Sequence, residues 1–85
     1  MKLDCGISRK RIVGWLNDEL ALSHEGQAWF FEVNGKTCRI TANALASRQL
    51  GAVKVERTLV SIEGDESAAE AFMHVFTLRF MSAGG

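Results

Sequence analysis

Residues 28–41 read Ala-Trp-Phe-Phe-Glu-Val-Asn-Gly-Lys-Thr-Cys-Arg-Ile-Thr. Aromatic and β-branched residues flank the central Asn-Gly pair, the dipeptide that most readily adopts the two positive φ angles of a type I′ turn. A two-residue loop fixes the register of the two strands, and side chains alternate between the two faces of a sheet. The segment therefore predicts a β-hairpin whose core face carries Trp29, Phe31, Val33, Cys38 and Ile40.

The opposite face of this hairpin is mostly polar but contains one large aromatic side chain, Phe30, directly across from Arg39. Three explanations remain open for it. Another element covers Phe30, or Arg39 packs over the ring in a cation–π contact, or Phe30 contacts a binding partner. In the third case Phe30, Glu32 and Arg39 are the candidate partner-binding residues.

The segment after the hairpin predicts a short helix over Ala42–Leu50. Thr41 is a suitable N-cap, Ile40 and Leu45 have the spacing of a hydrophobic staple, and a glycine follows at position 51. The next stretch, Val53–Ile62, is rich in β-branched residues and predicts a strand. Arg57 interrupts its alternation, which indicates a bulge or a bend there.

The C-terminal segment favours a helix from Ala68 to Phe80. Residues 67–70, Ser-Ala-Ala-Glu, have the pattern of a capping box, and the following apolar residues recur at helical spacing. A strand also stays open, because its alternation would place on one face Phe72, His74, Phe76, Leu78 and Phe80. In a helix, His74 points away from the Phe72 and Phe76 side chains and has no assigned role.

The N-terminal segment Ser8–Leu22 is ambiguous between a helix and two strands. Ile12, Leu16 and Leu20 have helical spacing. However, basic residues at the start and acidic residues at the end oppose the helix macrodipole. We favour two strands, over residues 11–16 and 19–23.

Composition and length indicate one small α+β domain over residues 1–85. Apolar residues make up 47% of the chain and charged residues 24%, which is globular rather than disordered composition. The expected fold is a small antiparallel sheet of about three to five strands around the Asn-Gly hairpin, with one or two helices on its apolar face. We expect a cytoplasmic protein, because the sequence contains no membrane-spanning apolar run and no signal-peptide core.

The formal net charge is zero, but charges of one sign are grouped along the chain. Arg9, Lys10 and Arg11 form the only basic run and are the candidate nucleic-acid-binding residues. Dedicated nucleic-acid-binding domains usually have an isoelectric point above about 9, whereas this chain has about 6.7. Nucleic-acid binding is therefore the alternative function rather than the favoured one.

No catalytic, cofactor or metal site is predicted. Cys5, His24, Cys38 and His74 lack the closely spaced ligand pairs of structural zinc sites. Cys38 lies on the core face of the hairpin, where burial suppresses thiolate formation.

The Asp65-Glu66 pair stands beside a helix start and is better explained as capping than as an acid/base dyad. The glycines are scattered and form no phosphate-binding loop. We expect a protein that is not an enzyme.

The run Trp29–Lys36, followed by Cys38–Thr41 and Ala44-Leu45, resembles a family of short bacterial proteins of unknown function, the domain-of-unknown-function type numbered fourteen-eighty-eight. The pattern of that family is an aromatic strand, an Asn-Gly turn, Cys-x-Ile-Ser/Thr, and then Ala-Leu in a helix. The resemblance covers residues 29–45 well and the segment after Phe72 loosely. It implies a bacterial accessory protein and supplies no activity.

The function that these observations favour is binding of a protein partner or self-association. A chain of this length builds only a modest core, and small domains often complete their packing against another surface.

Overall fold

The computed structural model describes residues 1–81, which form a five-stranded sheet and two helices. In chain order the elements are β1 (Lys2–Cys5), α1 (Arg9–Gly14), a π-helical turn η1 (Trp15–Glu19), β2 (Ser23–Glu25), β3 (Ala28–Val33), β4 (Lys36–Leu50), β5 (Val53–Gly64) and α2 (Glu66–Phe80). The strands are arranged in the order β1-β5-β4-β3-β2, and every neighbouring pair is antiparallel. The predicted α+β class is confirmed.

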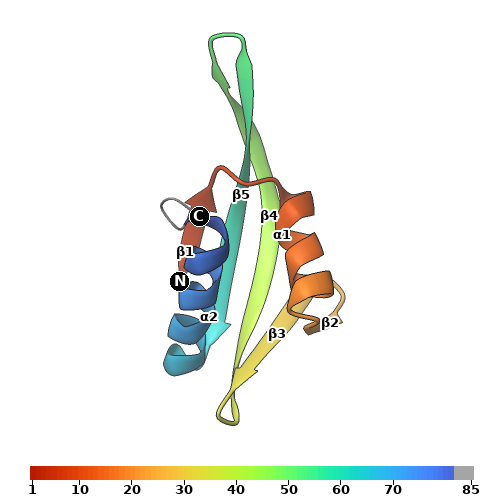
Figure 1. The fold of residues 1–85 in the computed structure, drawn as a ribbon, viewed down its shortest axis with the longest axis vertical. Helices are drawn as coiled ribbons and strands as arrows, with labels where there is room; N and C mark the ends of the chain where they lie inside the picture. Colours follow the sequence, from red (N-terminus) through yellow and green to blue (C-terminus); the bar gives the residue numbers. More distant parts are fainter. Residues whose placement is uncertain (82–85) are drawn as a thin grey trace.

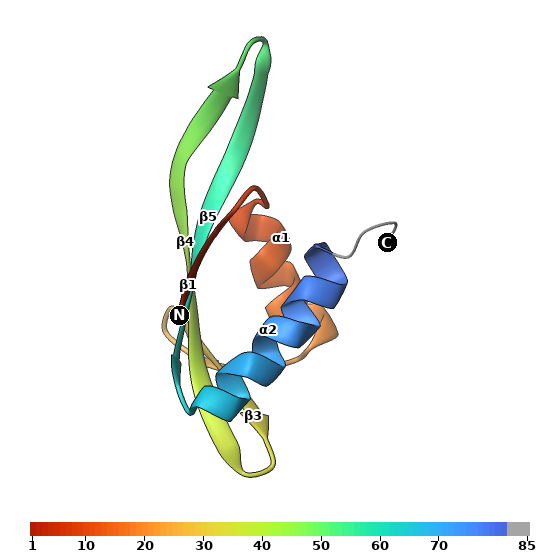
Figure 2. The same ribbon diagram turned by 90° about the vertical axis from the view of Figure 1, so that its left-hand side faces the viewer.

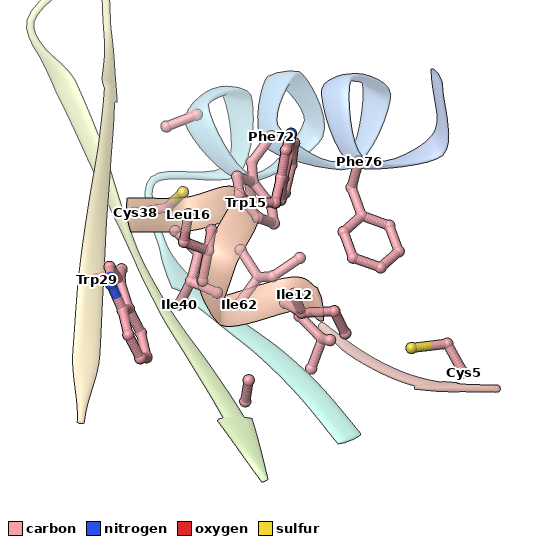
Figure 3. Close-up of a cluster of buried hydrophobic side chains, with 14 residues drawn as sticks. Cys5, Ile12, Trp15, Leu16, Trp29, Cys38, Ile40, Ile62, Phe72 and Phe76 are labelled. Carbon is pink, nitrogen blue, oxygen red and sulfur yellow. The ribbon is translucent and has the colours of Figure 1, made fainter. Parts of the chain in front are cut away.

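Both helices lie on the same face of the sheet (Figures 1 and 2). Between that face and the helices lies the hydrophobic core, in which Trp15 of η1 contacts the rings of Phe72 and Phe76 of α2 (Figure 3). The Trp15 ring also contacts Phe80 at the end of α2. None of the helices among residues 1–81 has the length and apolar character needed to cross a membrane.

The predicted hairpin is confirmed as β3 and β4, in the predicted register. Trp29 pairs with Ile40 and Phe31 with Cys38, and Asn34 and Gly35 have φ angles of 51° and 75°. Trp29, Cys38 and Ile40 are buried, and Phe31 and Val33 pack against the same core. The turn chemistry and the alternation of side chains were therefore sufficient to predict this element.

The predicted helix over Ala42–Leu50 is wrong, because these residues continue β4. Ala42 pairs with Val60, and Leu50, which the helix would have docked on the sheet, is 56% exposed. Pairing with β5 outweighs the weak local helix preference of this alanine-containing segment, since a ladder to the next strand satisfies the same backbone hydrogen-bonding groups as a helix would.

The strand predicted over Val53–Ile62 is confirmed and runs on to Gly64. The predicted irregularity at Arg57 is also present. Leu45 pairs with Arg57 and Arg48 with Val55, so two residues of β4 face Glu56 alone. The extra residue of this bulge lies in β4, whereas the interrupted alternation that predicted it lies in the partner strand β5.

The two strands favoured over residues 11–16 and 19–23 are wrong. The chain there forms α1 and η1, and Ile12, Trp15 and Leu16 are all buried. The Ser8 hydroxyl caps α1 by accepting a hydrogen bond from the amide of Arg11 at 3.3 Å. Strand β1 was not predicted at all, since a four-residue strand with two charged residues has no distinctive pattern.

The predicted C-terminal helix is confirmed, but it begins at Glu66 and does not use the capping box predicted at residues 67–70. Asp65 rather than Ser67 is the N-cap, and its Oδ1 accepts a hydrogen bond from the amide of Ala68 at 2.9 Å. Phe72 and Phe76 are fully buried and His74 is exposed, as the helical spacing predicted.

Candidate functional site

The face of the sheet opposite the helices is open in the part of the chain that the structure describes (Figure 2). The registers of four strands align Ser23, Phe30, Arg39 and Glu63 in one row across this face. Phe30 is half-buried, and the other three are exposed. We call this row, together with Glu32, the open-face row.

Neither of the two explanations for Phe30 that act within the chain holds among residues 1–81. Both helices lie on the other face of the sheet (Figure 2), and the two cation–π contacts among residues 1–81 both involve Phe80, with Arg11 and Arg79. Phe30 is also not part of the core cluster. Its ring therefore belongs to the open face of the sheet rather than to the interior.

The structure brings the three predicted partner-binding residues onto the same face. Phe30 and Arg39 are direct cross-strand partners, and Glu32 lies two residues further along β3. Sequence reasoning missed Glu63, which pairs with Arg39 from β5. The only sequence signal for Glu63 was its position in the side-chain alternation of β5. The register between β4 and β5 was needed to place Glu63 beside Arg39.

The charged members of the open-face row form no ion pairs with one another or with other side chains among residues 1–81. The three salt bridges among residues 1–81 join Lys36 to Asp65, Arg57 to Asp4 and Arg79 to Glu19. Glu32, Arg39 and Glu63 take part in none of them, so the half-buried ring of Phe30 is bordered by charges of both signs whose hydrogen-bonding groups face solvent.

The basic run Arg9-Lys10-Arg11 does not form one continuous surface. Arg9 Nε donates to the carbonyl oxygen of Ala42 at 2.7 Å, and its Nη2 donates to Gln27 Oε1 at 2.8 Å. The guanidinium of Arg11 lies 5.6 Å from the ring centre of Phe80. Lys10 is exposed, and its side chain makes no hydrogen bond, salt bridge or cation–π contact with the described residues. Because successive helical residues point about 100° apart, three adjacent cations cannot track one strand of phosphates together.

Both cysteines are buried, and burial raises the pKa of each thiol. Nearby carboxylates add to this effect, Asp4 for Cys5 and Asp65 for Cys38. The thiolate is the nucleophilic form, so both positions disfavour thiol chemistry. Within residues 1–81 no three His, Cys, Asp or Glu side chains gather in a metal-binding group.

The predicted explanation of Asp65 as a helix cap is confirmed. Its carboxylate accepts from the Ser67 hydroxyl and the Ala68 amide, and these hydrogen bonds lower its pKa below the usual 3.8. The pKa of Asp4 is also lowered, first by its hydrogen bonds to Arg57. Asp4 is exposed and Asp65 is partly exposed, which limits their individual contributions to stability.

These two carboxylates predict the direction of the acid sensitivity. A group whose pKa is lowered by folding contributes stability above its unfolded-state pKa and loses it as the pH falls through the folded-state value. We expect the urea midpoint of the wild type to fall more between about pH 5 and about pH 2 than that of the double variant Asp4→Asn/Asp65→Asn. Asparagine still caps a helix, so this variant removes mainly the charge. Equal acid sensitivity of the two proteins would contradict the assignment.

A protein-family model matches residues 4–85 of the chain. The matching family is described as archaeal MoaD-like protein. The chain belongs to this family. No curated protein and no solved structure gave a significant match to this MoaD-like chain.

The resemblance to the bacterial fourteen-eighty-eight family is therefore wrong, and the bacterial origin inferred from it has no support. The MoaD-like match covers almost the whole chain, whereas the resemblance rested on residues 29–45. Those residues are explained by an Asn-Gly hairpin, which unrelated proteins share. The helix that the resemblance placed at Ala44-Leu45 is also strand in this protein.

Proposed function

We propose that this MoaD-like protein binds a protein partner through the open-face row, with Phe30 as the central contact. The observation that carries the proposal is the position of Phe30, a half-buried aromatic side chain at the centre of a row of exposed polar groups on the uncovered face. Aromatic and arginine side chains contribute most of the binding energy in protein interfaces, and a polar rim around them excludes water.

The charges around Phe30 support a protein partner rather than a polyanion. Arg39 pairs with Phe30 on one side and with Glu63 on the other, and Glu32 lies on the same face two residues after Phe30. This face therefore presents charges of both signs. A phosphate backbone requires a predominantly positive surface, whereas a protein surface can supply complementary charges of both signs. Membership of a MoaD-like family supports the proposal, because MoaD-like proteins typically act through protein partners. The proposal assigns no reaction to the chain.

The variant Phe30→Asp tests the proposal by placing a charge at the centre of the row. Phe30 lies outside the core cluster, so we expect the fold to survive, with an unchanged circular dichroism spectrum. In lysate of the organism that encodes the chain, tagged wild type is expected to retain a stoichiometric protein through a high-salt wash, and Phe30→Asp to lose it. Loss of about tenfold or more in affinity is expected for a central aromatic contact.

The matched control is Leu78→Asp, which introduces the same charge on an exposed apolar residue of α2, in the helical layer. This control should retain the partner. Light scattering distinguishes self-association, for which wild type would show a mass above the 9.3 kDa of one chain and Phe30→Asp would not. If Phe30→Asp and Leu78→Asp behave alike in both measurements, the open-face row is not the binding surface.

A further inference from the structure

The β4–β5 hairpin extends well beyond the rest of the molecule (Figures 1 and 2). We call its outer part, residues 46–57, the arm. Strand β1 pairs with β5 only as far as Thr58, and β3 pairs with β4 only as far as Ile40, so the arm is a two-stranded ribbon without sheet neighbours. None of its residues belongs to the core cluster or to the partly buried residues packed against it. Core packing therefore does not explain the length of this hairpin.

The arm and its base are rich in basic side chains. The arm contains Arg48, Lys54 and Arg57 against the single acidic residue Glu56. Lys10 of α1 reaches the same region, since it lines a surface hollow of about 270 Å³ with Glu56 and Arg57. The whole chain is neutral, so the remainder carries the compensating negative charge.

These basic residues divide into one anchor and three exposed cations. Arg57 hydrogen-bonds to both carboxylate oxygens of Asp4 and donates to the carbonyl oxygen of Ala46 at 3.3 Å, which fixes the base of the arm against β1. Lys10, Arg48 and Lys54 are exposed and take part in none of the salt bridges among residues 1–81. These three side chains can therefore form ion pairs with a bound anion.

The tip of the arm is apolar. Leu50 and Val53 are cross-strand partners on either side of the Gly51-Ala52 turn, and they are 56% and 61% exposed. They are the only large hydrophobic residues within the arm that reach this exposure. An acidic protein surface or a free phosphate would leave these two side chains without an apolar contact.

We infer that the arm binds duplex DNA by entering the major groove. Paired strands lie about 4.8 Å apart, and with its side chains such a ribbon fits a groove about 12 Å wide. The five residues of each arm strand span about 17 Å, more than the groove depth of about 8.5 Å. Lys10, Arg48 and Lys54 would contact phosphates, and Leu50 and Val53 would reach base edges, where thymine methyl groups are apolar partners. The A-form major groove of duplex RNA is too narrow for this entry.

The inference is tested by fluorescence anisotropy with a labelled DNA duplex of about 20 base pairs, at about 50 and about 200 mM KCl. With three phosphate contacts, the affinity is expected to fall about 40-fold between these salt concentrations. The double variant Arg48→Ala/Lys54→Ala should bind at least about tenfold more weakly at the lower concentration, and its salt slope should be smaller by about two. All substituted residues are exposed, so the fold should be retained.

The matched control is Lys2→Ala/Lys36→Ala, which removes the same charge from exposed positions outside the arm and should bind DNA like the wild type. The tip variant Leu50→Ser/Val53→Ser should weaken binding without changing the salt slope. Equal weakening by the arm and control variants would overturn the inference.

Equal affinity for duplex RNA would also overturn it, as would binding to phosphatidylglycerol vesicles or polyglutamate in preference to DNA. Phe30→Asp should leave DNA binding unchanged, which separates this test from that of the proposed function.

Discussion

Replacing Phe72 by alanine is expected to lower the free energy of unfolding by about 3–5 kcal/mol. Phe72 is fully buried, and its ring centre lies 5.7 Å from that of Trp15, 5.5 Å from that of Phe31 and 6.3 Å from that of Phe76. It thus joins η1, β3 and α2 at one point of the core, and Figure 3 shows its ring beside that of Trp15. Truncation leaves a cavity among rigid aromatic rings that cannot collapse to fill it.

This loss is large relative to the total, because a domain of this length has a free energy of unfolding of about 4–13 kcal/mol. The measurement is the midpoint and slope of urea unfolding followed by tryptophan fluorescence. The control is Leu78→Ala on the same helix, where the side chain is 60% exposed and the expected change is within about 0.5 kcal/mol. Similar losses for the two variants would mean that the core does not centre on Phe72.

Replacing Gly64 by alanine is expected to cost about 2–5 kcal/mol, because strain and a steric clash combine at this position. Gly64 has a φ of +123°, and a Cβ atom there would lie 2.8 Å from the backbone oxygen of Thr37 and 3.1 Å from Cys38 Cα. Both contacts are with the backbone, so no side-chain rotation relieves them. The chain must shift where β5 ends and the cap of α2 begins.

The control for Gly64 is Gly51→Ala at the tip of the arm. Gly51 also has a positive φ, +61°, but a Cβ atom there would meet no atom of a non-neighbouring residue within 4 Å. The expected cost there is only that of a left-handed non-glycine residue, about 1–2 kcal/mol. Hydrogen exchange provides a local measurement, since the Asp65 amide donates to the Thr37 oxygen at 3.2 Å and should lose protection only in Gly64→Ala. An equal cost at both glycines would show that the close approach of Thr37 has no energetic effect.

Local chemistry in the amino-acid sequence was enough to predict the β3–β4 hairpin and α2. The Asn34-Gly35 turn fixes the strand register, so the core face and the pairing of Phe30 with Arg39 followed from the sequence. Helix α2 carries its apolar residues at helical spacing and a capping residue just before its start. In both elements the local preference and the tertiary environment agree. Two of the charged residues around Phe30 were therefore predictable from the turn alone.

Tertiary structure alone decided the N-terminal segment. The basic and acidic ends of residues 9–19 oppose a helix by about 0.3–1 kcal/mol per charge. Burial of Ile12, Trp15 and Leu16 against α2 and the sheet contributes about 1.5–3 kcal/mol for each side chain and outweighs that cost. Sequence periodicity alone did not show that α2 and the sheet would provide an apolar surface for these side chains to pack against.

Residues 42–50 were likewise decided by strand pairing, because their backbone groups pair with β5, the strand that follows the turn at Gly51-Ala52. This pairing created the arm, and the β4–β5 register placed Glu63 beside Arg39. The sequence by itself determined the elements whose turns and caps act within a few residues. The tertiary structure determined those stabilised by burial or strand pairing with distant residues, because such energies depend on what the rest of the chain brings into contact.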